Sequence, residues 1–318
     1  MMRLRRLKRD VLTENLQIYS RNRIKKNIQL YSLLLPVFVL LFIFCYIPMY
    51  GVVIAFQDWF PGNPFIGPDV RWVGLKHIIR FVSSEYFGRI IRNTLVLSGL
   101  NLAFGFTLPI FFALLLDQIK SLNFRKLTQT ASYMPYFISI VVVAGMVISF
   151  INTNGIITNI LVFFGLERMD FRLSKSAFRW IYTITNIWKG FGFGSILYYA
   201  TITSIDPQLY ESAKIDGANR WQQVLHITLP GIQRIIAINL IMSIGGLLGT
   251  NSDLILLLYT PATYEVADVI GTYVYREGIV GGAFSYTAAV GLFMAVFGFI
   301  LTFTANRVSN KLTDYGLW

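Results

Sequence analysis

The chain has 318 residues, of which 55 % are hydrophobic and only 14 % are charged, and its formal net charge is +12. Soluble domains carry about 25 % charged residues, and a soluble chain with this composition would expose large apolar patches to water. The composition therefore excludes an ordinary soluble protein and predicts an all-α integral membrane protein, because the apolar runs do not alternate as barrel strands do.

Four charge-free runs and two further apolar stretches, 180–204, which is broken only by Lys189, and 235–252, give six predicted transmembrane helices. Each stretch is long enough for one crossing, because about 20 helical residues span the hydrocarbon core. The polar sequence NTNG at 152–155 marks an exit from the membrane, after which 156–164 is expected to lie in the interface. The predicted helices, each within about four residues, are 31–56, 90–116, 131–151, 179–203, 233–257 and 284–306.

The N-terminal segment 1–27 predicts the orientation. It contains nine Lys and Arg residues, so the positive-inside rule places it in the cytoplasm, and six crossings return the C-terminus to the same side. Leucines at helical spacing among these charges predict a basic amphipathic helix on the anionic inner leaflet. A nucleic-acid-binding arm is disfavoured because nothing else in the chain supports it.

The sequence contains no recognisable catalytic or metal-binding motif. It has no phosphate-binding GxxxxGK[ST] loop and no GxSxG element. Cys45, His77 and His226 are isolated, so no metal site is predicted. An ion-driven carrier would bury a carboxylate near the middle of the membrane, but the acid nearest to a crossing is Asp253, towards the outer end of the fifth. The chain is therefore predicted not to be an enzyme and to take its energy from elsewhere.

The stretch YESAKIDGANRWQQVLHITLPGI, in the loop between the fourth and fifth predicted helices, is the exception to this apolar pattern. Asp206 as N-cap and Pro207 in the first turn predict a short helix. Gly217 permits a bend, Asp216 is expected to cap a second helix, and Pro230 is expected to end it. The residues expected to share one face of the second helix are Ala218, Trp221, Leu225 and Thr228.

This stretch closely resembles the EAA loop of the permease subunits of bacterial ABC importers, with Ser212 where Ala is more usual. The segments YMPYFISIVVVAGM (133–146), TNIWKGFGFGSILYYATITSIDPQLYESAKIDGA (185–218) and VIGTYVYREGIVGGAFSYTAAVGLF (269–293) resemble the branch of sugar permeases that handles oligo- and polysaccharides, including alginate-type and pectin-derived sugars. Together these segments cover about half of the chain.

The resemblance implies a type I importer in the bacterial inner membrane. In it this chain would be one permease (28–318, with the coupling loop 204–232) of a heterodimer with a second, homologous permease. Two ATP-binding subunits and an extracytoplasmic solute-binding protein complete the assembly, and ATP-Mg binds only the ATPase partners. Glu211 would pair with a basic residue of the ATPase. The other residues expected to form or close the docking bend are Ala213, Asp216, Gly217, Ala218, Leu229 and Pro230.

Four residues near predicted mid-membrane depth or the outer mouth are candidates for the carbohydrate path. Trp188 would stack on a sugar ring, and Lys189, the basic residue deep in the fourth helix, would favour an acidic sugar. Lipid packing for Trp188, and pairing of Lys189 with Asp253 or with a helix end, remain open. Asn251 and Asp253 are expected at the cavity mouth. A stand-alone secondary sugar carrier is the alternative function.

Overall fold

The computed structural model describes residues 27–28, 30–313 and 315–318, so most of the predicted N-terminal amphipathic helix (1–26) lies outside the described residues. Within the described ranges the secondary structure is helical apart from an isolated bridge between Gln57 and Trp72. The predicted all-α fold is therefore confirmed.

The first half of the chain forms one apolar helix followed by a chain of helices that continue into one another. The first helix is Leu30–Phe56, which includes α2 (Ile47–Met49). A loop and the short α3 (Lys76–Val82) follow. The next elements are α4 (Phe87–Leu100), a π-helical segment (Asn101–Phe106), α5 (Thr107–Gln118), α6 (Leu122–Tyr133), α7 (Ile140–Ile151) and α8 (Ile156–Phe163).

The second half begins with the long helix α9 (Lys175–Thr203). The coupling-loop region holds α10 (Pro207–Ile215), α11 (Arg220–Gln223) and a π-helical segment (Val224–Thr228). The remaining helices are α12 (Leu229–Gly245), α13 (Ser252–Leu258), α14 (Tyr264–Ala267), α15 (Ile270–Val274) and α16 (Phe284–Thr313).

Five helical segments of the described chain are long and apolar enough to cross a membrane, against the six predicted crossings. They are Leu30–Phe56, Phe87–Gln118, Ile140–Phe163, Arg220–Gly245 and Phe284–Thr313. The predicted fourth crossing corresponds to α9, which has 29 residues but is too polar to qualify by composition. Its polar residues include Asn186 and Lys189.

Two predicted boundaries are wrong, each for a local reason. The third crossing does not begin at 131: a tight turn at Met134–Phe137, which contains Pro135, separates α6 from α7. The fifth does not run to 257: α12 ends at Gly245, in a stretch that also contains Gly246 and Gly249. A turn does lie at 152–155, because α7 ends at Ile151, α8 begins at Ile156 and the Gly155 N–H donates to the carbonyl of Asn152 at 2.9 Å, whereas an exit from the membrane at this point stays a prediction.

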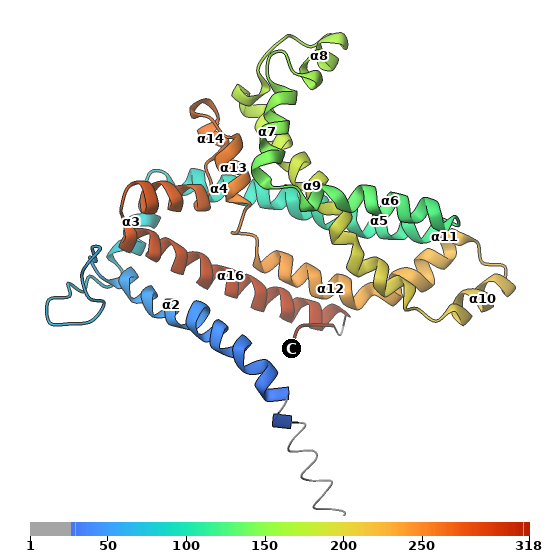
Figure 1. The fold of residues 1–318 in the computed structure, drawn as a ribbon, viewed down its shortest axis with the longest axis horizontal. Coiled ribbons are helices and arrows are strands. Elements are labelled where there is room, and N and C mark those ends of the chain that lie inside the picture. The colour runs from blue at the N-terminus through green and yellow to red at the C-terminus, as the bar shows by residue number, and fades with distance from the viewer. Residues whose placement is uncertain (1–26, 29, 314) are drawn as a thin grey trace, which may run out of the picture.

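The helices are arranged along one long axis, with the coupling loop at one end (Figure 1). α10 and α11 lie at one end and α3 at the other, while α7 and α8 project away from the bundle. α16 packs against α12, and the two helices approach closely at Gly245, since a Cβ there would lie 2.0 Å from Oγ1 of Thr302. Gly249 lies in the break after α12 and lines a cavity.

Candidate functional site

The coupling loop begins with a helix that the local sequence defines at both ends. The side chain of Asp206 accepts a hydrogen bond from the backbone N–H of Gln208 at 2.9 Å, and Pro207 occupies the first turn. Both features confirm the predicted start of α10, because an Asp N-cap satisfies a free N–H and Pro has no N–H to leave unsatisfied.

α10 ends in a Schellman turn centred on Gly217. Ala218 N–H donates to the carbonyl of Ala213 at 2.8 Å, and Gly217 N–H donates to the carbonyl of Lys214 at 3.1 Å. Gly217 has φ +82°, a left-handed conformation that glycine adopts without Cβ strain. The predicted bend at Gly217 is therefore confirmed. Asp216 is the C-terminal cap of α10, so the prediction that it caps the second helix is wrong.

The second helix starts with a capping box formed by Asn219 and Gln222. The Gln222 side chain accepts from the Asn219 N–H at 2.7 Å, and the Asn219 side chain accepts from the Gln222 N–H at 2.9 Å. This arrangement satisfies two free backbone donors reciprocally. Asn219 therefore performs the capping that the sequence had suggested for Asp216.

The expectation that Pro230 ends the second helix is also wrong. The helix runs without interruption from Arg220 to Gly245. It passes Pro230 by means of the π-helical segment, in which Leu229 N–H donates to the carbonyl of Val224, one residue beyond the usual partner. This wider turn accommodates a residue that lacks an N–H and crowds the preceding turn. The coupling loop is therefore continuous with a membrane helix.

The two arms of the loop are joined near their base by a hydrogen bond between hydroxyl groups. Tyr210 Oη and Thr228 Oγ1 are 3.0 Å apart, and Thr228 is fully buried. Burial also raises the pKa of the Tyr210 phenol, so the phenol stays protonated and able to donate across the physiological range. A second bond runs from Gln223 Nε2 to the carbonyl of Ala218 at 3.0 Å. The loop is a closed and stiff element.

The tip of the loop is exposed. Glu211, Asp216 and Gly217 are exposed, Ala213 and Ala218 are half-buried, and Ile215 and Trp221 are 87 % and 64 % exposed. Along the predicted shared face of the second helix, Thr228 is buried together with Val224, whereas Trp221 and Leu225 are exposed. Exposed apolar side chains around a bend are typical of a docking surface. The sequence did not single out Ile215, although it stands alone among polar neighbours.

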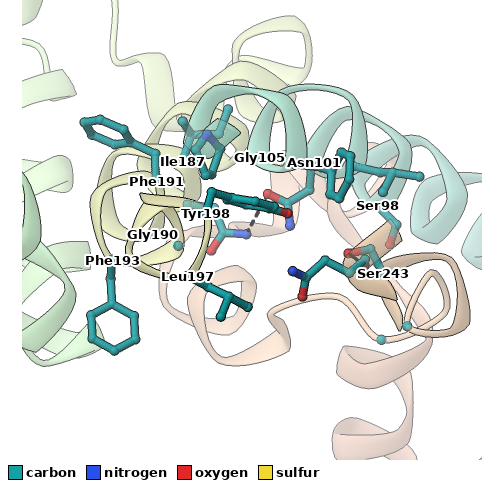
Figure 2. A pocket seen from close by; sticks show the side chains of 18 of the residues that line it. Ser98, Asn101, Gly105, Ile187, Gly190, Phe191, Phe193, Leu197, Tyr198 and Ser243 are labelled. Atoms are coloured by element: carbon teal, nitrogen blue, oxygen red, sulfur yellow. Dashed lines mark hydrogen bonds between the residues drawn. The ribbon is translucent and has the colours of Figure 1, made fainter. Parts of the chain in front are cut away.

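A cavity of about 800 Å³ lies between α9, the α4–α5 helix and the end of α12. Figure 2 shows Ser98, Asn101, Tyr198 and Ser243 around the same space. The volume falls within the range of small-molecule sites. The other polar side chains that line it belong to Tyr182, Asn186, Asn239 and Thr250.

Three asparagines from three segments form a hydrogen-bonded chain beside this cavity. Asn186 Nδ2 donates to Asn101 Oδ1 at 3.2 Å, and Asn251 Nδ2 donates to Asn186 Oδ1 at 3.2 Å. The Asn251 N–H also donates to the Tyr182 hydroxyl at 3.1 Å. Amides and hydroxyls facing a membrane cavity suit a ligand with many hydroxyl groups. The sequence did not single out Asn101 and Asn186 as site residues. Their position as polar residues inside long apolar runs could have indicated them.

Trp188 and Lys189 are not among the residues that line this cavity. Trp188 lines a separate, wholly apolar groove between α5 and α9, together with residues such as Trp180 and Phe112. Lys189 Nζ donates to the carbonyl of Tyr136 at 2.6 Å and lies 5.3 Å from the centre of that ring. In this chain Lys189 thus binds a helix end, and its contact with a sugar stays a prediction.

Asn251 and Asp253 occupy different surroundings. Asn251 belongs to the asparagine chain, and its side chain also caps α13 by accepting from the Leu254 N–H at 3.3 Å. Asp253 is exposed in the first turn of α13. The structure therefore brings Asn251 next to the cavity, and it does not bring Trp188, Lys189, Asn251 and Asp253 together around one space.

The end of the molecule opposite the coupling loop is braced by ion pairs that the sequence did not predict. Asp268 is fully buried, and its two oxygens lie 3.0 and 2.8 Å from the guanidinium of Arg276. In the first loop, Lys76 Nζ lies 3.0 and 2.9 Å from the oxygens of Asp58. The hydrogen bond from Lys76 lowers the pKa of the Asp58 carboxyl. These pairs connect the first loop to α3, and the segment before α15 to the segment after it.

Residues 105–314 match the model of the family described as binding-protein-dependent transport system inner membrane component. The polygalacturonan/rhamnogalacturonan transport system permease protein YteP of Bacillus subtilis is 43 % identical over 290 residues, which covers 91 % of this chain and 90 % of that protein. Protein LplB of the same organism is 37 % identical over 315 residues and 98 % of each chain.

Solved structures show the same relationship. A chain of a bacterial ABC transporter involved in the import of the acidic polysaccharide alginate has a TM-score of 0.82 and 44 % identity, covering 92 % of this chain and 98 % of that one. A chain from bacterial alginate ABC transporter in complex with an alginate pentasaccharide-bound periplasmic protein has the same TM-score and identity, covering 93 % and 99 %.

Proposed function

Because the chain belongs to the family of binding-protein-dependent transport system inner membrane components, we propose that it is a permease subunit of an ATP-driven importer of oligo- or polysaccharides. The family match, the relatives at 43 % and 37 % identity and the alginate transporter fold support this function. The observation that carries it within this chain is the stiff coupling loop that continues into a membrane helix. The chain itself is not an enzyme, because ATP hydrolysis belongs to a separate subunit.

The coupling loop transmits force from an ATPase subunit to the membrane helices. Its Schellman turn, capping box and Tyr210–Thr228 bond resist bending, and a stiff element passes on a displacement that a flexible loop would absorb. Glu211 pairs with a basic residue of the ATPase. The bend that enters the ATPase is formed by Ala213, Asp216, Gly217 and Ala218, and Leu229 and Pro230 join it to α12.

The importer contains more than this chain. It pairs with a second, related permease, two ATPase subunits that bind ATP-Mg, and an extracytoplasmic binding protein that delivers the sugar. The chain lies in the bacterial inner membrane with both termini in the cytoplasm, as the nine basic residues of 1–27 favour. In this orientation the coupling loop faces the cytoplasm, where the ATPase is, and α3, which lies at the opposite end in Figure 1, faces outside.

The cargo is an oligosaccharide, and we infer an acidic one. The asparagine chain and the cavity hydroxyls provide donors and acceptors for sugar hydroxyls. The structural relative imports an acidic polysaccharide. Trp188 and Lys189 remain proposed contacts on the sugar path, on a part of α9 that does not line the described cavity, and Asp253 remains a proposed contact at its mouth.

Reconstitution in proteoliposomes tests this function. The permease pair, the ATPase subunits and the binding protein are expected to accumulate an acidic oligosaccharide only when ATP is present on the ATPase side. Uptake that needs an ion gradient and no ATPase would instead establish the stand-alone carrier.

A further inference from the structure

Arg179 is not itself among the residues that line the cavity, but its position in the sequence puts it on the same face of α9 as several of them. It precedes the lining residues Tyr182, Asn186 and Gly190 by three, seven and eleven residues, which is the spacing of one helix face. At a rise of about 1.5 Å per residue, it lies about one turn beyond Tyr182 towards the start of α9. That end of α9 is the one remote from the coupling loop, so Arg179 is placed at the outer entrance.

The guanidinium of Arg179 is unpaired in the part of the chain that the structure describes. Its Nε is buried and has no hydrogen-bond partner among the described residues, and the side chain is half-buried overall. Arginine stays charged at any pH that a protein meets, and withdrawing a charge from water without a partner is unfavourable. The guanidinium of Arg179 is therefore available to bind an anion from outside the chain.

Three acidic residues on or beside the elements around the outer end of α9 are already paired with other cations, and a fourth, Asp253, does not pair with Arg179. The segment Phe171–Leu173 and helix α14 both pack against α9, and the carboxylates on and beside them bind other cations. Asp253, on α13, is exposed and makes no ion pair with Arg179 among the described residues. The occupied pairs are Asp170–Arg172, Glu265–Lys175 and Asp268–Arg276.

We propose that Arg179 binds a carboxylate of the incoming sugar and thereby selects acidic over neutral oligosaccharides at the entrance to the cavity. The proposal rests on the proposed function as a sugar permease. A guanidinium offers two parallel N–H groups that match a carboxylate. The asparagine chain one to two turns further along then supplies the amides that suit the sugar hydroxyls. Lys189, by contrast, already donates to the carbonyl of Tyr136.

The test compares an acidic oligosaccharide with the same oligosaccharide after reduction of its carboxyl groups. Each is loaded at saturation on the binding protein, and the loaded protein is supplied at increasing concentrations to the complete transporter in proteoliposomes of zwitterionic lipid, so that KM refers to the loaded binding protein. For Arg179→Gln we expect KM for the acidic cargo to rise roughly tenfold to a hundredfold, as for loss of a charge-assisted hydrogen bond, while uptake of the neutral cargo is unchanged. Arg179→Lys keeps the charge and is expected to retain part of the preference.

The matched control is Arg92→Gln, which removes an exposed cation near the corresponding end of α4 and is expected to leave both KM values unchanged. If Arg179→Gln reduces the uptake of both cargoes equally, the proposal is overturned and Arg179 has a structural role. If the wild type prefers the acidic cargo only when anionic lipid is added, the proposal is also overturned, and Arg179 binds a lipid phosphate instead. If the wild type imports neither cargo with ATP, the proposed function itself fails.

Discussion

Replacement of Gly217 tests whether the bend of the coupling loop is a docking element. Gly217 has φ +82°, and a Cβ built on it meets nothing within 4 Å. An alanine there incurs only backbone strain, about 1–2 kcal/mol for a left-handed L-residue, and no clash within this chain. Asparagine tolerates this conformation better than alanine. Tryptophan has the same strain and adds a large side chain to the exposed tip.

The expected order of ATP-driven uptake is therefore wild type, Gly217→Asn, Gly217→Ala and, with no uptake, Gly217→Trp. The strain in Gly217→Ala lowers the population of the closed turn by roughly fivefold to thirtyfold relative to open forms, so a partial loss is expected. Uptake in proteoliposomes and co-purification of the ATPase subunits are the two measurements. All variants should insert into the membrane, because the bend contributes no buried contact.

Gly165 provides a matched control. It has φ +93°, its Cβ would also meet open space, and it ends α8 in the same type of turn, with Leu166 N–H donating to the carbonyl of Leu161 at 3.1 Å. Gly165→Trp therefore introduces the same strain and bulk away from the coupling loop, and it should retain the ATPase subunits. If Gly217→Trp binds the ATPase and transports like the wild type, the docking role is refuted.

Three further predictions concern single contacts. Tyr210→Phe and Thr228→Val should each lower the sugar imported per ATP hydrolysed, and their effects should not add because both remove one hydrogen bond; Thr228→Ser, which keeps the hydroxyl, should retain coupling, and additive losses would contradict this. Asn186→Leu removes both hydrogen bonds that Asn186 makes in the asparagine chain and should raise KM for the sugar by about tenfold. An unchanged KM would show that this cavity does not lie on the sugar path. The hydrogen bond from Lys76 lowers the pKa of the Asp58 carboxyl. The stability that this pair adds is therefore fully present above the ordinary carboxyl pKa and is lost as the pH falls through the lowered pKa. Thermal unfolding in detergent should show this loss of stability in acid, and Asp58→Asn should remove the pH dependence.

Apolar runs predicted the five helices that are long and apolar enough to cross a membrane, but not where the runs break. The length of an apolar run is set by the membrane, so 284–306 and 31–56 correspond closely to Phe284–Thr313 and Leu30–Phe56. A break depends on local backbone chemistry within an equally apolar run. The 3₁₀ turn Met134–Phe137 and the end of α12 at Gly245 are of this kind, and hydropathy does not register them.

The coupling loop was more predictable than the cavity because its signals are local. The cap at Asp206 and the bend at Gly217 depend on residues a few positions apart. The helix continues past Pro230 because of a π-helical turn, which the sequence pattern does not predict. The cavity assembles Asn101, Asn186 and Asn239 from distant helices, and their common location follows only from the tertiary packing.

The most direct test of the central claim is sugar uptake by proteoliposomes that contain the permease pair and the binding protein, measured with and without the ATPase subunits. The account predicts accumulation of an acidic oligosaccharide only with the ATPase subunits and ATP, and its loss in Gly217→Trp. Accumulation that persists without the ATPase subunits, driven by an ion gradient, would contradict it.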